Sequence, residues 1–271
     1  MDLLERDRQL GALDGWLREA AAGQGRFVLV GGEAGVGKTA LLGQFCGMAR
    51  GRARVLIGAC DALSTPRPLG PLLDIAAGAG GVLDRLMSGD APRDQIFRAT
   101  LTELGAGLTP TLVVIEDAHW ADEATLDLLR FLGRRLDLLR TLVVVTYRDD
   151  EVGPRHPLRL LLGDLTTTAA IRRMGIPPLS EAGIRVLASG SGLDPTALHR
   201  LTGGNPFFAT EVLADKAAAA VAGGIPATVH DAVLARTSRL PPLARELLDA
   251  AAVIGSPISP ELLTQVAETT A

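Results

Sequence analysis

Eight consecutive residues have the types and the spacing to bind phosphate groups: Gly32, Glu33, Ala34, Gly35, Val36, Gly37, Lys38 and Thr39. They match the pattern G-x-x-x-x-G-K-[ST] at every fixed position. In this pattern the glycines let the backbone curl so that N–H groups point inward, Lys38 supplies an ammonium, and Thr39 offers a hydroxyl to Mg²⁺. The stretch, called the phosphate-binding loop below, predicts a site for ATP or ADP with Mg²⁺, and Ala40 begins the element that follows it.

The sequence on either side of the phosphate-binding loop supports this reading. Residues 26–30 form a short apolar run typical of a strand, and residues 40–45 have the character of a helix. A helix N-terminus adds unpaired N–H groups and its positive dipole end to an anion site. Only Lys38 and Lys216 are lysines among 27 basic residues, so one of the two stands where a compact ammonium is required. The alternative, a glycine-rich loop without chemistry in a chain of 31 glycines, is disfavoured by this context.

A second acidic motif ends another apolar run, Val113-Val114-Ile115-Glu116-Asp117. Hydrolysis of a γ-phosphate needs a carboxylate near the metal and a second group that orients water, both at the carboxyl end of a buried strand. We assign Glu116 to Mg²⁺ and Asp117 to the attacking water; the alternative is an acidic pair that only caps a helix near Asp122. Because Asp is one methylene shorter than Glu, it reaches less far toward water, so we expect slow turnover.

Composition limits the classes of function that the chain can have. The 271 residues carry a formal net charge of −4 and a pI near 5.6, which argues against broad electrostatic attachment to nucleic acid. No apolar run reaches the roughly 18 to 20 residues of a membrane span, and the first residues lack the layout of a secretory signal. We therefore expect a cytoplasmic protein with no membrane partner, whose two cysteines, Cys46 and Cys60, are reduced and buried.

The order of apolar runs along the chain predicts an α/β fold. Continuous apolar runs suit strands buried on both faces of a parallel sheet, and after about residue 176 helical patterns dominate. We predict a three-layer nucleotide-binding domain at 1–175, a helical lid at 176–235 and the start of a winged-helix module, truncated, at 236–271. The segment around residues 66–81, rich in Pro and Gly, cannot be placed. Strands are predicted at 26–30, 54–57, 112–115, 142–146 and 169–174, and helices at 3–22, 40–45, 95–105, 181–188, 195–201, 206–221, 229–240 and 243–253.

Four spaced motifs resemble those of one known family. The run from Glu116 to Asp122, Glu-Asp-Ala-His-Trp-Ala-Asp, looks like the Walker B signature of the signal-transducing STAND branch of P-loop ATPases, especially the AAA-like ATPase domains of large ATP-binding LuxR-type (MalT-like) regulators. Residues 4–7 stand at the place of that family's N-terminal Gly-Arg-Glu motif, which gives Arg6 a contact near the adenine; Glu5 and Asp7 depart from the commoner residues. Residues 146–148 resemble the family's sensor, so Arg148 is implied to sense the γ-phosphate. Residues 204–208 resemble its lid motif, which brings Pro206 to the base.

The resemblance implies a nucleotide-dependent switch that controls lid position and self-association through the ATPase domain. It implies DNA binding only through an output domain that this chain lacks. Simpler alternatives stay open at this stage: His119 and Trp120 as packing, Arg148 as a surface ion pair, and Asn205 as a helix cap beside Pro206. Two rival functions also stay open. One is an ATP-dependent phosphotransferase, and the other is a scaffold that binds ATP without hydrolysing it.

Overall fold

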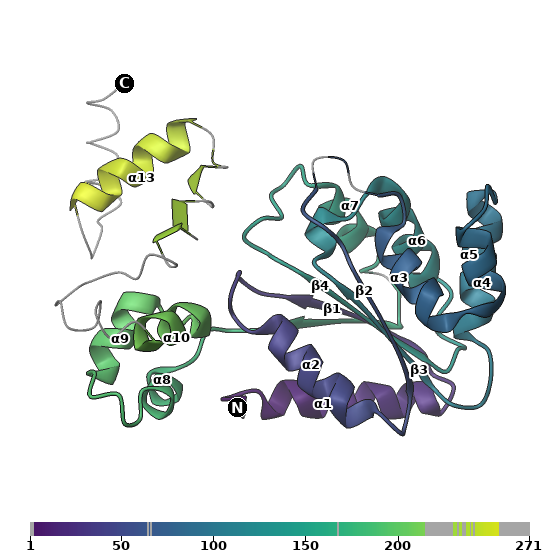
Figure 1. Cartoon of the computed structure of the whole chain (residues 1–271), viewed down its shortest axis with the longest axis horizontal. Coiled ribbons are helices and arrows are strands. Elements are labelled where there is room, and N and C mark those ends of the chain that lie inside the picture. The colour runs from purple at the N-terminus through teal and green to yellow at the C-terminus, as the bar shows by residue number, and fades with distance from the viewer. Residues whose placement is uncertain are drawn as a thin grey trace.

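The computed structural model describes residues 3–63, 65, 67–166, 168–214, 230, 231, 233, 234, 237, 238, 240 and 242–254. A five-stranded sheet in the order β2-β3-β4-β1-β5 forms the centre of its larger part (Figure 1). Every neighbouring pair of strands is parallel, which confirms the predicted fold class. The strands are β1 (Arg26–Gly31), β2 (Arg54–Ala59), β3 (Thr111–Glu116), β4 (Thr141–Tyr147) and β5 (Ile171–Gly175).

The three central strands are buried on both faces, as their unbroken apolar sequences predict. In β1, Val28 and Val30 belong to the core on one side of the sheet, while Phe27 and Leu29 belong to the core on the other side. This alternation follows from the two-residue repeat of a strand. Complete burial of one such side chain contributes about 1.5 to 3 kcal/mol to stability. The rigid sheet that results fixes the positions of the loops at its carboxyl ends.

Helices of the described residues cover both faces of the sheet (Figure 1). On the first face lie α1 (Asp7–Ala21), which packs through Leu10, Leu13 and Leu17, and α2 (Lys38–Ala49). On the second face α6 (Glu123–Gly133) is capped by Asp122, whose side chain accepts the N–H groups of Ala124 and Thr125. This arrangement is the three-layer domain that was predicted. The other helices of the second face are α3 (Gly70–Ala79), α4 (Gly81–Met87), α5 (Arg93–Leu104) and α7 (Pro157–Asp164).

After β5 the chain forms a small helical unit with a core of its own, called the lid below. It contains α8 (Glu181–Leu187), α9 (Pro195–Thr202) and α10 (Pro206–Ala214). Its buried residues include Leu179, Ile184, Leu198, Ala209 and Val212. Sequence signals set the helix limits, because Ser180 and Asp194 cap α8 and α9 and Gly203 ends α9 in the left-handed conformation.

Some sequence predictions fall beyond the described residues. The predicted helix at 206–221 is described only as α10, and the rest lies outside the described residues. The helix predicted at 243–253 is present as α13 (Pro242–Ile254). Parts of the helix predicted at 229–240 and more than half of the winged-helix module at 236–271 lie outside the described residues as well, so the domain limits at 175 and 235 stay predictions.

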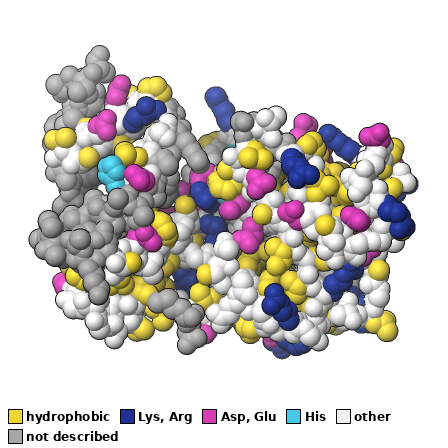
Figure 2. Space-filling model, in the orientation of Figure 1, with side chains coloured by type: hydrophobic (Ala, Val, Ile, Leu, Met, Phe, Trp, Pro, Cys, Tyr) yellow, Lys and Arg dark blue, Asp and Glu magenta, His cyan; other side chains and the backbone are white. Residues whose placement is uncertain are grey.

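Two surface properties bear on partners. Acidic and basic side chains are interspersed over the sheet domain on the face shown in Figure 2. Such a mixture gives no broad field of one sign for a polyanion. A search of the described residues for a helix with the length and apolar character of a bilayer span found none.

Candidate functional site

The phosphate-binding loop joins the carboxyl end of β1 to the first turn of α2. Two of its glycines, Gly35 and Gly37, have φ angles of 78° and 99°, a conformation that side chains with a Cβ rarely adopt. Val36 between them is completely buried and anchors the loop to the core. Because α2 starts at Lys38, the N–H groups of its first turn have no partner four residues earlier within the helix. The loop and the helix together form a concave surface of N–H donors suited to an anion.

Lys38 lies inside the loop that it is expected to serve. Its ammonium donates to the carbonyl of Gly32 at 2.6 Å and to that of Glu33 at 2.8 Å, and the residue is buried. Burial lowers the pKa of Lys38, whereas the negative charge of Asp117 acts in the opposite direction. The lysine and the acidic motif therefore interact electrostatically across the site.

The predicted metal ligands are in direct contact. The hydroxyl of Thr39 donates to Oε2 of Glu116 over 2.6 Å, although 77 residues separate the two in the chain. Glu116 is the last residue of β3, and Thr39 is the second residue of α2. No group of three or more acidic, histidine or cysteine side chains fit for a metal occurs among the residues the model describes. Mg²⁺ needs no such cage, because it is usually held by one or two protein oxygens together with phosphates and water.

Asp117 has a strained backbone at the end of β3. Its φ and ψ angles of 56° and 42° are left-handed, which is uncommon for a residue other than glycine. The backbone N–H of Asp117 donates to Oγ1 of Thr146, a buried residue of the neighbouring strand β4, over 2.9 Å. This bond ties the residue that follows β3 to the neighbouring strand. Strain of this kind is concentrated at functional sites.

A buried histidine lies between two carboxylates beside the site. His119 is 5% exposed, and neither of its ring nitrogens has a hydrogen-bond partner in the described part of the chain. Nδ1 lies 3.8 Å from Asp117 Oδ1, and Nε2 lies 3.8 Å from Glu151 Oε2. Burial lowers the pKa of His119 to about 4, against the opposing effect of Asp117 and Glu151. The imidazole is therefore neutral near pH 7.

Arg148 follows β4 and forms two contacts at this edge of the sheet. Its Nη1 lies 2.6 Å from Oε1 of Glu151, and its guanidinium lies over the ring of Trp120 with 4.7 Å to the centroid. Trp120 also packs against His119 at 4.5 Å between ring centroids. The ion pair that the sequence left open as an alternative for Arg148 is thus present. A role in sensing phosphate stays a prediction.

A cavity of about 220 Å³ opens next to the phosphate-binding loop and is mostly apolar. Arg6 and Pro206, the two residues implied to lie near the base, line it together with Ala40. Thr210 also lines it, but its hydroxyl donates to backbone carbonyls of its own helix. The remaining lining residues come from the N-terminal segment, the loop and the lid: Leu3, Leu4, Val36, Gly37, Leu179 and Leu187.

Arg6 is committed to backbone carbonyls within this wall. It is buried, and its Nη2 donates to the carbonyl of Pro177 at 2.9 Å and to that of Val36 at 3.2 Å. The guanidinium therefore connects the phosphate-binding loop to the segment between β5 and the lid. The contact between Arg6 and adenine stays a prediction.

The lid contacts the phosphate-binding loop directly. The side chain of Asn205 donates to the carbonyl of Ala34 over 2.9 Å, and the N–H of Phe207 donates to the carbonyl of Gly35 over 3.3 Å. Sequence reasoning considered Asn205 only as a helix cap and missed this contact. Its one signal was composition, because Asn205 is the only asparagine in the chain.

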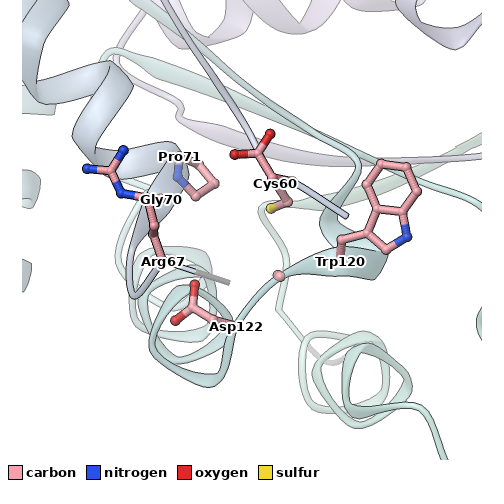
Figure 3. Close-up of a pocket in the computed structure, with 8 residues that line it drawn as sticks. Cys60, Arg67, Gly70, Pro71, Trp120 and Asp122 are labelled. Carbon is pink, nitrogen blue, oxygen red and sulfur yellow. The ribbon is translucent and has the colours of Figure 1, made fainter. Parts of the chain in front are cut away.

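A second, small pocket of about 10 Å³, roughly the space of one water, is lined by Trp120 and Asp122 among others (Figure 3). The side chain of Asp122 accepts the N–H of Leu69 over 3.2 Å. This hydrogen bond holds the turn before α3. Cys60 also lines this pocket, and burial raises the pKa of its thiol to about 12. Both cysteines are free and buried, as predicted.

The residues present fit a nucleotide with its metal ion. Donor N–H groups and an ammonium meet at the start of α2, a hydroxyl and a carboxylate meet beside them, and an apolar cavity adjoins both. All of these lie at the carboxyl ends of parallel strands, where α/β sheets bind ligands. The fold and the site define a P-loop nucleotide-binding domain of the ATPase class.

Comparison with known families agrees with this class. A model of the AAA ATPase domain family matches residues 2–145, more than half of the chain. The chain belongs to this family of AAA ATPase domains.

Relatives and solved structures have limited identity to the chain. An uncharacterized protein of Rhizobium meliloti (strain 1021) is 27% identical over 258 residues, which covers 78% of this chain and 24% of that protein. The chain thus spans about a quarter of the length of this curated relative. Among solved structures, Cdc6p from Pyrobaculum aerophilum has a TM-score of 0.58 at 19% identity and covers 81% of this chain and 62% of its own.

Two further solved structures share the fold. A signal transduction ATPase with numerous domains (STAND) from Pyrococcus horikoshii, which has a tetratricopeptide repeat sensor, has a TM-score of 0.51 at 19% identity, covering 96% of this chain and 36% of its own. Orc1 from Aeropyrum pernix, solved in complex with DNA, has a TM-score of 0.54 at 17% identity, covering 99% and 78%. At this identity the likeness shows the fold alone.

Proposed function

We propose that this chain is the ATP-binding, slowly hydrolysing and Mg²⁺-dependent switch of a larger LuxR-type transcriptional regulator. The observation that carries the proposal is the 2.6 Å contact between Thr39 and Glu116. It brings the hydroxyl of the phosphate-binding loop and the carboxylate of β3 to one point, where a metal ion bound to the phosphates would be held. Lys38 lies one residue away on the same helix turn.

The phosphates and the base of the nucleotide would bind in two different parts of the site. The first turn of α2 and the Lys38 ammonium would hold the phosphates, and the 220 Å³ cavity would hold the base against Ala40 and Pro206. On binding, the ammonium would exchange its loop carbonyls, at 2.6 and 2.8 Å, for phosphate oxygens. This exchange keeps the buried charge paired in both states.

Hydrolysis would depend on the acidic motif. Mg²⁺, when bound, neutralises charge on the phosphate oxygens. Glu116 would hold the metal through its oxygens, and Asp117 would orient water and accept its proton. Arg148 would meet the γ-phosphate after leaving Glu151. Because Arg148 is paired with Glu151 in this structure, that rearrangement adds a step and is consistent with slow turnover.

The switch would act through the lid. Asn205 and Phe207 bind the backbone of Ala34 and Gly35, so a change in the loop at the phosphates changes the surface on which the lid rests. Two arrangements of one element, biased by a ligand, are the physical basis of such a switch. In a larger protein this movement would control self-association and the exposure of a DNA-binding output domain. The resemblance of the motifs supports that part.

Two substitutions in the complete chain test the proposal. Lys38→Ala should lose most of its ATP affinity, whereas Asp117→Asn should bind ATP as the unchanged chain does and release no phosphate. Lys216→Ala, which removes the only other lysine, is the matched control and should behave as the unchanged chain. Binding is measured by calorimetry and phosphate release by a coupled assay without an added acceptor.

The same assays separate the rival functions. Phosphate release that requires a second substrate would favour a phosphotransferase. ATP recovered intact after long incubation would favour a scaffold. Unchanged ATP binding in Lys38→Ala would place the nucleotide elsewhere and refute the proposed site.

A further inference from the structure

Glu5 has a backbone conformation that glycine adopts far more readily than other residues do. Its φ angle is 56°, and the only other non-glycine residues with positive φ in the described part of the chain are Leu69 and Asp117. A left-handed conformation is unfavourable for a residue with a side chain. Asp117 belongs to the acidic motif, and Leu69 is held by Asp122. Glu5 therefore needs a separate explanation.

The side chain of Glu5 reaches the lid, 175 residues further along the chain. Oε2 accepts the backbone N–H of Ser180 over 2.8 Å, and Oε1 accepts the Ser180 hydroxyl. Ser180 is the capping residue of α8. Hydrogen bonds from the Ser180 side chain and then from its backbone hold the pKa of the Glu5 carboxyl below its ordinary value. The carboxylate is ionised near pH 7, so both contacts are charge-assisted.

A glycine in α8 leaves the space that this carboxylate occupies. A Cβ atom at Gly183 would lie 2.9 Å from both Cδ and Oε1 of Glu5. Real Cβ atoms do not approach other atoms so closely. Glycine inside a helix is less favourable than alanine. The left-handed backbone of Glu5 and the glycine at position 183 are each locally unfavourable. Both allow the contact between the Glu5 carboxylate and Ser180.

The residues next to Glu5 form part of the base cavity. Leu3, Leu4 and Arg6 line it from the N-terminal side, and Leu179 and Leu187 line it from the lid side. Arg6 fixes the N-terminal side to the phosphate-binding loop and to Pro177. Glu5 joins the two sides, because it belongs to the first and binds the capping residue of α8 in the second.

We propose that Glu5 is a positioning residue that holds the lid closed over the base cavity and so sets the rate at which the nucleotide leaves. The inference rests on the proposed function, since it takes the cavity as the site of the base. It adds a residue that touches no part of the nucleotide and acts through the lid.

Nucleotide release is the first test. Fluorescent ADP bound to the complete chain is displaced by excess ADP in a stopped-flow instrument. Glu5→Gly should release it about tenfold faster, the equivalent of one charge-assisted hydrogen bond, while the association rate changes less. Glu5→Gln should have a smaller effect because it keeps one acceptor. Glu123→Gln, which changes an exposed glutamate on α6, is the control and should leave the release rate unchanged.

A purely structural role predicts a different pattern. Glu5→Gly removes the backbone strain, so its free energy of unfolding should fall little even though release is faster. Gly183→Ala should also speed release, because the methyl group displaces the carboxylate. In the double variant the two effects should not add, since both remove one contact. Additive effects, or release that changes only in proportion to stability, would overturn the inference.

A measurement without nucleotide completes the test. In the unchanged chain the Ser180 amide should be protected from hydrogen exchange by Glu5, and Glu5→Gly should remove that protection. If the unchanged chain binds no ADP, the proposed function fails and this inference fails with it. If ADP binds normally but the Glu5 variants release it at the unchanged rate, only this inference fails.

Discussion

Asn205 of the lid and Ala34 of the phosphate-binding loop are joined by a hydrogen bond of 2.9 Å across 171 residues of sequence. Next to this bond, a Cβ atom placed on Gly35 would lie 2.8 Å from Cβ of Phe207 and 3.0 Å from Oδ1 of Asn205. Gly35 is therefore constrained twice, by its positive φ angle and by the lid that rests on it. The surfaces of the lid and of the phosphate-binding loop are thus complementary at this contact.

Substitution of Gly35 should separate these two surfaces. Gly35→Ala should lower the free energy of unfolding by about 1 to 3 kcal/mol, because it combines backbone strain with a clash. It should also increase hydrogen exchange in α10. Gly43→Ala is the matched control, since a Cβ there meets no atom within 4 Å and alanine favours the helix. Urea denaturation of both variants measures the difference, and an equal change in the two would contradict the role given to Gly35.

The contact between Thr39 and Glu116 predicts how ATP affinity depends on Mg²⁺. Thr39→Val keeps the shape of the side chain but removes the hydroxyl, so ATP affinity should no longer improve when Mg²⁺ is added. Affinity measured in EDTA should change little, because the N–H groups and Lys38 remain. Thr39→Ser restores a hydroxyl and should recover most of the Mg²⁺ effect. Calorimetric titrations with and without Mg²⁺ test this, and a Thr39→Val chain that still responds fully to Mg²⁺ would place the metal elsewhere.

The buried imidazole of His119 predicts a loss of stability in acid. Its pKa is about 4 in the folded chain and about 6.5 when unfolded, so between these values the unfolded chain binds more protons. Stability should therefore fall as the pH decreases from about 6.5 toward 4, by roughly 2 to 3 kcal/mol from this group. His119→Gln should flatten the curve in this range. Denaturation at several pH values measures it, and a slope that survives His119→Gln would be evidence against this origin.

Much of the sheet domain could be predicted because its signals are local. Each central strand is an unbroken apolar run, and β1 with its loop and α2 follows a motif whose residue types have separate physical tasks. The segment that forms α3 and α4 could not be placed. Its Pro and Gly residues signal turns, yet the helix is fixed by a contact with Asp122, 53 residues from Leu69. Local sequence carries no information about such a partner.

The candidate site likewise contains residues that local sequence predicts and residues that it does not. Lys38, Thr39, Glu116 and Asp117 were predicted from residue type and spacing, and the model brings them to one edge of the sheet. The contacts of Glu5 and Asn205 were missed, because a glutamate near the start of a chain or an asparagine before a proline has many ordinary roles. Their importance depends on distances across the fold, which spacing along the chain does not encode.

The strand order has a consequence for what fits between the two halves of the site. β4 lies between β1 and β3, so the strand that carries the phosphate-binding loop and the strand that carries Glu116 are about 10 Å apart. Side chains close this distance, since the hydroxyl of Thr39 and the carboxylate of Glu116 meet at 2.6 Å. A substitution that changed the path of β4 would therefore alter the separation of the two halves of the proposed site without touching either of them.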